Sequence, residues 1–172
     1  RTYEAIVRFG VPLHENGDDE GLKKLFRTTT FIDLASAVAA TSLGIAAASA
    51  AGGFLHWDEQ MISLAGLYSL VMLTTFINTP NGILLLYDRF DALSVFYTVG
   101  PTVRITGVLL AWYLDAGMHV FIAVWAAAFV LENCWLIALG RLELKQHISG
   151  SLWKGAKWRS IEYANREFRQ FI

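Results

Sequence analysis

The sequence is poor in cysteine and in charged residues, and each shortage excludes a class of protein. Cys134 is the only cysteine of the 172 residues, so an internal disulfide framework is excluded. Charged residues make up 17% of the chain, against about 25% in a typical soluble domain, while 55% of the residues are hydrophobic. This balance argues against a soluble domain and favours a membrane protein.

The sequence also lacks the motifs of soluble enzymes. The four histidines are scattered through the chain without the spacing of metal ligands. Neither a Gly-x-Ser-x-Gly nucleophile motif nor a glycine-rich phosphate loop is present. We therefore expect no metal, no cofactor, no covalent chemistry and no nucleic-acid partner.

Cations are missing from two particular connections. The segments 54–60 and 115–119 contain neither Lys nor Arg, whereas thirteen of the fourteen Lys and Arg residues lie outside four long apolar stretches. Those thirteen fall before the first stretch, between the second and third, and after the fourth. Because cytoplasmic loops of membrane proteins are enriched in Lys and Arg, the pattern predicts that both chain ends are cytoplasmic.

The apolar stretches are long enough to cross a bilayer, so we predict an all-α, polytopic membrane protein. A cytoplasmic connection over 1–28 would contain a short helix that begins near Asp18. A basic, amphipathic tail over 141–172 would lie on the anionic inner leaflet. Four spanning helices form the bundle over 29–140, at about 29–54, 61–86, 92–114 and 120–140.

Proline and glycine predict three interruptions. Gly10 and Pro12 would end an initial helix, and Pro80 within the run 78–82 would kink the second span by freeing the carbonyl of Phe76. The pair Gly100-Pro101 would break the third span in the same way. Broken spans are tolerated where they line a cavity, which favours a transporter.

Three charged side chains lie inside the predicted spans, where an isolated charge is costly. At a helical rise of about 1.5 Å per residue, Asp33 lies about 6 Å, Glu132 about 12 Å and Arg104 about 18 Å from the cytoplasmic side. Asn78 would share the level of Glu132. We expect Arg104 and Glu132 to be in contact and Asp33 to be shallow enough to extend toward water.

Two interpretations of the Arg104–Glu132 pair are open. In the first, Arg104 binds an anionic group such as a phosphate, and Glu132 is its counter-charge and carries a coupling proton. Asp33 is a weaker candidate for the same coupling role. In the second, the pair is static and only holds two helices together.

The stretch from Thr79 to Asp91 (TPNGILLLYDRFD) resembles a segment of bacterial polysaccharide and lipopolysaccharide biosynthesis flippases of the MOP exporter superfamily. The region 101–107, the exit Gly140–Leu144 and the closing segment 158–172 are also similar to that family. Members often carry a basic residue where this chain has Leu85. This chain therefore lacks a cation that could recruit anions at the cytoplasmic rim. The chain would match helices three to six of the first lobe and, beginning at Arg1 without Met, would be part of a longer protein.

The resemblance implies that the chain is part of a transporter of the bacterial inner membrane. It would translocate an undecaprenyl-diphosphate-linked oligosaccharide by alternating access, for cell-surface polysaccharide assembly. Two alternatives remain: a complete four-helix membrane protein with a structural role, and a membrane enzyme acting on polyprenyl lipids. The implied site has a substrate-binding group (Arg104, Asn78, Asn81), coupling or counter-charges (Glu132, Asp33) and a cytoplasmic gate (Asp88, Arg89, Asp91).

Overall fold

The computed structural model describes residues 2–148, and this part of the chain is built from helices without strands. This confirms the predicted all-α class. The helices are α1 (Thr2–Glu15), α2 (Asp19–Leu55), α3 (Glu59–Ser69), the 3-10 helix η1 (Leu70–Thr74), α4 (Asn78–Leu86), α5 (Phe90–Tyr113) and α6 (Met118–His147).

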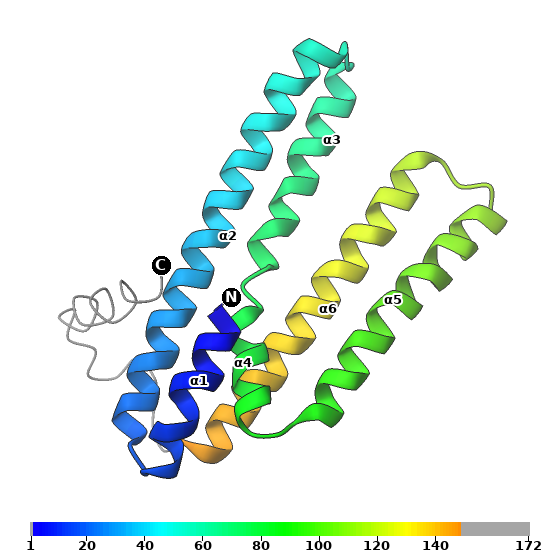
Figure 1. Ribbon diagram of the computed structural model, residues 1–172. Coiled ribbons are helices and arrows are strands. Elements are labelled where there is room, and N and C mark those ends of the chain that lie inside the picture. The colour runs from blue at the N-terminus through cyan, green and yellow to red at the C-terminus, as the bar shows by residue number, and fades with distance from the viewer. Residues whose placement is uncertain (1, 149–172) are drawn as a thin grey trace.

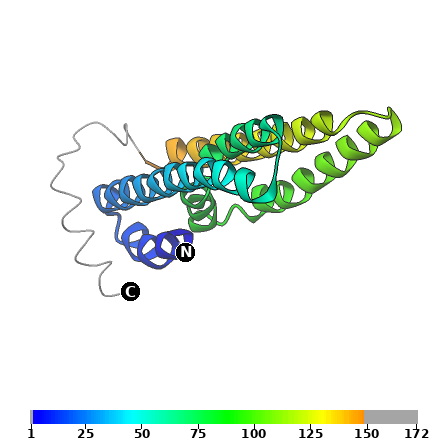
Figure 2. The same cartoon turned by 90° about the horizontal axis from the view of Figure 1, so that it is seen from above.

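The long helices form two hairpins that share a base and diverge from it (Figure 1). One hairpin pairs α2 with α3 and η1, and the other pairs α5 with α6. Helices α1 and α4 lie at the base, where α4 contacts α1 and α6. Seen after a turn of 90° (Figure 2), α1 projects to one side of the layer that the hairpins form.

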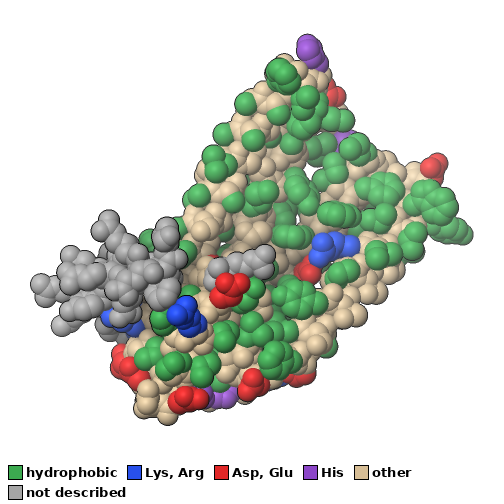
Figure 3. Space-filling view, viewed as in Figure 1, with side chains coloured by type: hydrophobic (Ala, Val, Ile, Leu, Met, Phe, Trp, Pro, Cys, Tyr) green, Lys and Arg blue, Asp and Glu red, His purple; other side chains and the backbone are tan. Residues whose placement is uncertain are grey.

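Four helical segments of the described chain are long and apolar enough to cross a membrane: Asp19–Leu55, Glu59–Leu86, Phe90–Tyr113 and Met118–His147. Large apolar side chains are exposed along them, among them Phe31, Leu43, Leu109 and Leu131. Hydrophobic side chains cover both hairpins in Figure 3, whereas acidic side chains gather at the base. An outward apolar surface of this extent is what lipid contact requires.

The buried core lies at the base. One cluster joins α1, α2, α4 and α6 through Ile6, Leu22, Phe26, Ile83, Leu86 and Leu144. A second joins α4, α5 and α6 through Leu84, Leu93, Phe96 and Leu136. The hairpin tips contribute to neither cluster, so the packing that fixes the fold is concentrated where the helices meet.

Two predicted helix boundaries in the first 55 residues are wrong. Helix α1 continues through Gly10 and Pro12 and ends at Glu15, before Gly17 with a φ of 67°. Gly10 is buried against Leu86 of α4, so tertiary packing holds this segment helical. The predicted short helix and the first span are one helix, α2, because no Gly or Pro separates them at residues 27–29. Asp18 caps it as predicted, accepting from the Gly21 N–H at 2.9 Å.

The predicted interruption of the second span is present, but it begins earlier than expected. Helix α3 tightens into η1, residues 75–77 are not helical, and α4 starts at Asn78. Pro80 lies in the first turn of α4, where a missing N–H removes no helical hydrogen bond. Proline therefore starts a new helix here instead of kinking a continuous one.

The predicted break at Gly100-Pro101 is wrong, because α5 runs unbroken from Phe90 to Tyr113 with Pro101 inside it. Hydroxyl groups bond to carbonyls on this helix: Thr98 Oγ1 donates to Ser94 O and Thr102 Oγ1 to Thr98 O, both at 2.8 Å. Neither bond reaches the carbonyl of Tyr97, which Pro101 leaves without its helical donor, so the helix continues past the proline without a replacement for that bond from these hydroxyls.

Helix α6 is longer than predicted and includes residues 141–147 of the expected tail. The amphipathic tail predicted beyond it lies outside the described residues. The added two turns bring Glu143 and Leu144 into the base, where both are buried.

Gly140 of α6 allows the closest approach between α4 and α6. A Cβ at this position would lie 2.8 Å from Pro80 Cβ and 2.9 Å from Pro80 Cα, and a proline backbone cannot rotate away. Gly66 of α3 is different, because a Cβ added there would have no neighbouring atom within 4 Å.

We predict that Gly140→Ala lowers the stability of the protein by about 1–3 kcal/mol, the usual cost of overpacking. Thermal unfolding in detergent should show a lower midpoint for Gly140→Ala than for wild type. The matched control Gly66→Ala should unfold at or above the wild-type midpoint. Equal midpoints for the two variants would contradict the close α4–α6 contact.

Candidate functional site

Asp33 of α2 lies at the interruption of the second span. Its side chain is buried, with the residue only 4% exposed, so the expectation that it extends to water is wrong. Oδ2 accepts hydrogen bonds from the Thr79 N–H at 2.7 Å and the Thr79 hydroxyl at 2.8 Å. Oδ1 accepts a longer bond from Asn78 Nδ2 at 3.4 Å.

These bonds explain why a carboxylate is placed inside the membrane. The first turn of a helix leaves N–H groups without partners, and in hydrocarbon each such group costs several kcal/mol. Ile77, which precedes α4, has no side chain that can cap it. Asp33 supplies the cap from a neighbouring helix, and its negative charge also suits the positive end of α4.

The predicted contact between Arg104 of α5 and Glu132 of α6 is present as an ion pair, in which the guanidinium Nη2 donates to Glu132 Oε2. The two side chains are 22% and 11% exposed. Arg104 is fourteen residues from the start of α5 and Glu132 is fifteen from the end of α6. At about 1.5 Å per residue both lie about 21–22 Å from the base, closer in depth than the sequence predicted.

Aromatic rings surround the guanidinium. Arg104 Cζ lies 5.9 Å from the ring centroid of Trp125 and 5.8 Å from that of Phe129, both on α6. Both distances suit cation–π attraction. Arg104 Nε is buried and has no acceptor among residues 2–148. The guanidinium is thus held in place by one carboxylate and two rings, and its buried Nε–H is left for a further acceptor.

Gly100 creates the space that Glu132 occupies. A Cβ at Gly100 would lie 2.3 Å from both Cδ and Oε1 of Glu132. The glycine therefore lets the carboxylate lie directly against the backbone of α5, within range of Arg104 one turn further on. The role of Gly100 is to place a charge, whereas the sequence predicted a helix break there.

The two asparagines that were predicted to bind substrate with Arg104 are not gathered around it. Asn78 bonds to Asp33, and Asn81 Nδ2 donates to the hydroxyl of Tyr97 at 3.2 Å. Asn81 Oδ1 is buried and has no donor in the described part of the chain. Asn133, beside Glu132 in sequence, donates to Thr74 Oγ1 of η1 at 3.0 Å. The amides therefore tie the interrupted span to its neighbours.

Two of the three residues that were predicted to form a cytoplasmic gate, Arg89 and Asp91, are in contact. Arg89 Nε and Nη2 donate to the two carboxylate oxygens of Asp91 at 3.0 and 3.2 Å. Arg89 Nη1 also donates to Glu143 of α6, a partner that was not predicted because Glu143 was assigned to the tail. Asp88 forms the turn with a φ of 54° and joins no ion pair among residues 2–148.

Two rings extend this cluster. His147 Nδ1 lies 3.5 Å from Glu143 Oε1, and its ring stacks on Tyr87 with centroids 4.0 Å apart. The hydrogen bond to Asp91 raises the pKa of the Arg89 guanidinium, so that it stays charged, and burial raises the pKa of the Tyr87 phenol. The α4–α5 turn is thereby fastened to the end of α6.

We predict that Asp33→Leu exposes the amides at the start of α4 to exchange. Losing three bonds to a buried acceptor should cost about 1–3 kcal/mol, and hydrogen–deuterium exchange should quicken at residues 78–82. Asp33→Asn keeps one acceptor and should give an intermediate rate. Asp115→Asn, an exposed carboxylate at a hairpin tip, is the control; unchanged exchange in Asp33→Leu would contradict the cap.

Comparison with known proteins finds a curated relative. No protein-family model matches the chain, and no solved structure is similar to it. Over 117 residues, 68% of this chain, the sequence is 31% identical to the inner membrane protein YghQ of Escherichia coli strain K12. The matched stretch covers 33% of that protein, so the chain spans about a third of the length of this curated relative. Together with its four apolar spans, this similarity identifies the chain as a multi-pass protein of the inner membrane.

Proposed function

We propose that the chain is part of a flippase that moves a lipid-linked oligosaccharide across the inner membrane by alternating access. The substrate would be of the undecaprenyl-diphosphate type, as the resemblance to MOP exporters implies. The observation that carries the proposal is the Arg104–Glu132 pair, an arginine at mid-depth that is bound by a single carboxylate. Ionisable residues inside membrane spans are rare and mark substrate and ion pathways.

The geometry of Arg104 suits exchange between an internal and an external anion. Glu132 occupies one edge of the guanidinium, at Nη2, and Nε has no acceptor among residues 2–148. Arginine presents a planar fork that binds phosphate through paired hydrogen bonds. A diphosphate carries more negative charge than one carboxylate, so it would displace Glu132 on arrival, and Glu132 would neutralise Arg104 again after release.

The interruption of the second span supplies a place for movement. The segment Glu59–Leu86 is the least buried of the four spans, because only 6% of its apolar 18-residue stretch is buried. Residues 75–77 separate the arm formed by α3 and η1 from α4, which Asp33 and the base hold in place. Rotation at these residues would move the arm while the cap stays intact. Alternating access needs such a joint at membrane depth.

The cluster of Arg89, Asp91 and Glu143 fits the role of a cytoplasmic gate in this scheme. Arg89 connects the α4–α5 turn to α6 through Glu143, which is only 4% exposed. Separation of the two elements would break this ion pair, and their return would re-form it. The sugar-binding role of Asn78 and Asn81 remains part of the proposal only if the bonds to Asp33 and Tyr97 open during transport.

We predict that Arg104→Ala in the full-length protein reduces lipid-linked oligosaccharide translocation at least tenfold. Losing a charge-assisted hydrogen bond is worth about 1.5–3 kcal/mol, or roughly tenfold or more. Arg104→Lys keeps the charge without the planar fork and should retain partial activity. Translocation into proteoliposomes, corrected for the amount of folded protein, measures both.

The double variant Arg104→Gln/Glu132→Gln separates transport from packing. Paired amides keep a hydrogen bond between α5 and α6 without buried charge. If the pair is only structural, this variant should restore the stability and the transport lost in Arg104→Ala. Restored stability with transport still absent supports substrate binding, whereas full transport by the double variant removes Arg104 from the site.

A further inference from the structure

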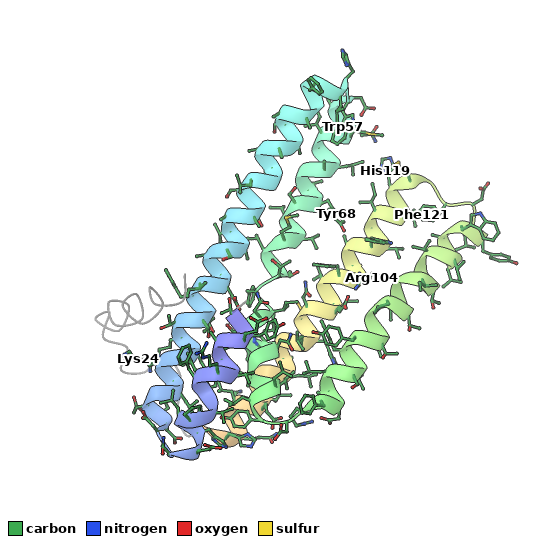
Figure 4. The ribbon with its side chains drawn as sticks, viewed as in Figure 1. Lys24, Trp57, Tyr68, Arg104, His119 and Phe121 are labelled. Carbon is green, nitrogen blue, oxygen red and sulfur yellow. The ribbon has the colours of Figure 1, made fainter. Side chains whose placement is uncertain are left out.

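A groove of about 620 Å³ lies between the outer parts of α3 and α6, at the end of the molecule away from the base. Its walls are mainly aromatic and aliphatic side chains, including Trp57, Met61, Tyr68, Phe121, Ile122 and Trp125. Figure 4 shows Trp57, Tyr68, His119 and Phe121 around the gap between the two hairpins. The volume is within the range of about 300–1,000 Å³ that small-molecule sites occupy.

The polar groups of the groove are confined to its mouth. Asp58, Gln60 and His119 lie in or before the first turns of α3 and α6, and Gln60 Nε2 and His119 Nε2 are 3.3 Å apart across the mouth. At about 1.5 Å per residue, Tyr68 is about 12 Å beyond Gln60 and Trp125 about 9 Å beyond His119 along their helices. A sugar would need hydrogen-bonding partners along its whole length, and the deeper walls provide few. A hydrocarbon chain with a polar head at the mouth fits this distribution.

Charge at the mouth indicates the kind of head group. Asp58 lines the groove, and Glu59 is the next residue along the chain. Residues 54–64 and 114–124 contain neither Lys nor Arg. This end therefore favours a cationic group over a purely anionic one. The first turn of α6 offers the complement: the Val120 N–H donates to Gly117 O at 2.9 Å, but Gly117 has no side chain to cap the N–H groups of Met118 and His119. Free N–H groups at a helix start bind phosphate.

We infer that the groove binds a zwitterionic phospholipid whose head carries a primary amine. Its phosphate would lie at the start of α6, its ammonium group beside Asp58 and Glu59, and one acyl chain along the groove toward Trp125. The groove ends at Trp125, whose ring lies 5.9 Å from Arg104 Cζ. The inference does not rest on the proposed flippase activity, because it gives no role to Arg104, Glu132 or a transported substrate.

The first test measures which lipids remain bound. The full-length protein is placed in nanodiscs of equal parts phosphatidylethanolamine, phosphatidylglycerol and phosphatidylcholine and released for native mass spectrometry. Phosphatidylethanolamine should be retained about two- to fivefold over the others, the range that an exposed ion pair allows. Equal retention of the three lipids would overturn the inference.

Groove-filling and charge variants locate the bound lipid. Ala65→Trp places an indole in the groove lining and should abolish the preference, whereas Leu67→Trp, on the same helix at a side chain 60% exposed outside the lining, should keep it. Asp58→Asn/Glu59→Gln removes two charges, and Asn remains a good cap for the Met61 N–H that Asp58 bonds at 2.8 Å. This variant should lose the preference for phosphatidylethanolamine while keeping total bound lipid.

Three outcomes would contradict the assignment. A preference that survives Ala65→Trp places the lipid elsewhere, and one that survives the charge variant removes Asp58 and Glu59 from head-group recognition. Displacement of the retained lipid by a soluble oligosaccharide would identify a sugar site instead. Circular dichroism and gel filtration check whether each variant is folded. If Ala65→Trp does not fold, the charge variant still tests the inference.

Discussion

The structure depends on how the N–H groups at one interruption of a membrane helix find hydrogen-bond acceptors. Between η1 and α4 the helical bonding pattern stops, and the N–H groups that begin α4 would face hydrocarbon. Asp33 accepts from the Thr79 N–H and hydroxyl, and thereby makes the interruption tolerable. A carboxylate is costly in this setting, but it replaces an equally costly set of unpaired donors. The packing of α1, α4 and α6 at the base follows from α4 starting where it does.

Asp33 and Arg104 show two different uses of a charge within the membrane. Asp33 is almost completely buried, and both of its oxygens accept hydrogen bonds, so nothing remains for a ligand. Arg104 is more exposed than its partner Glu132 and keeps a donor without an acceptor among residues 2–148. Whether all hydrogen-bonding atoms of the side chain have partners, more than how deep the side chain lies, distinguishes a structural charge from a candidate binding group. This is why the proposed function is based on Arg104 and not on Asp33.

The sequence predicted the class of fold and the main contact of the site, because both follow from where charged residues occur along the chain. Segregated cations defined the spans, and depth along two helices brought Arg104 and Glu132 together. It did not predict the partners of Asp33, because these depend on how α2 is rotated against α4. Pro12 and Pro101 were predicted to interrupt helices, whereas α1 and α5 continue through them. Glu143 was missed because α6 extends past the glycine that was expected to end it.

The same division of the molecule into base and arms connects the two proposed sites. The base holds the buried clusters, and the arms carry little buried surface, so local movement is expected in the arms. The lipid groove is bounded by α3 on one side and α6 on the other, and α3 packs along α2 and continues into the base through the interrupted segment 70–77. A change in the angle between the two hairpins would alter the width of the groove. If a lipid binds one width better than another, it stabilises the corresponding arm position, and the arm position sets the affinity for the lipid by the same factor.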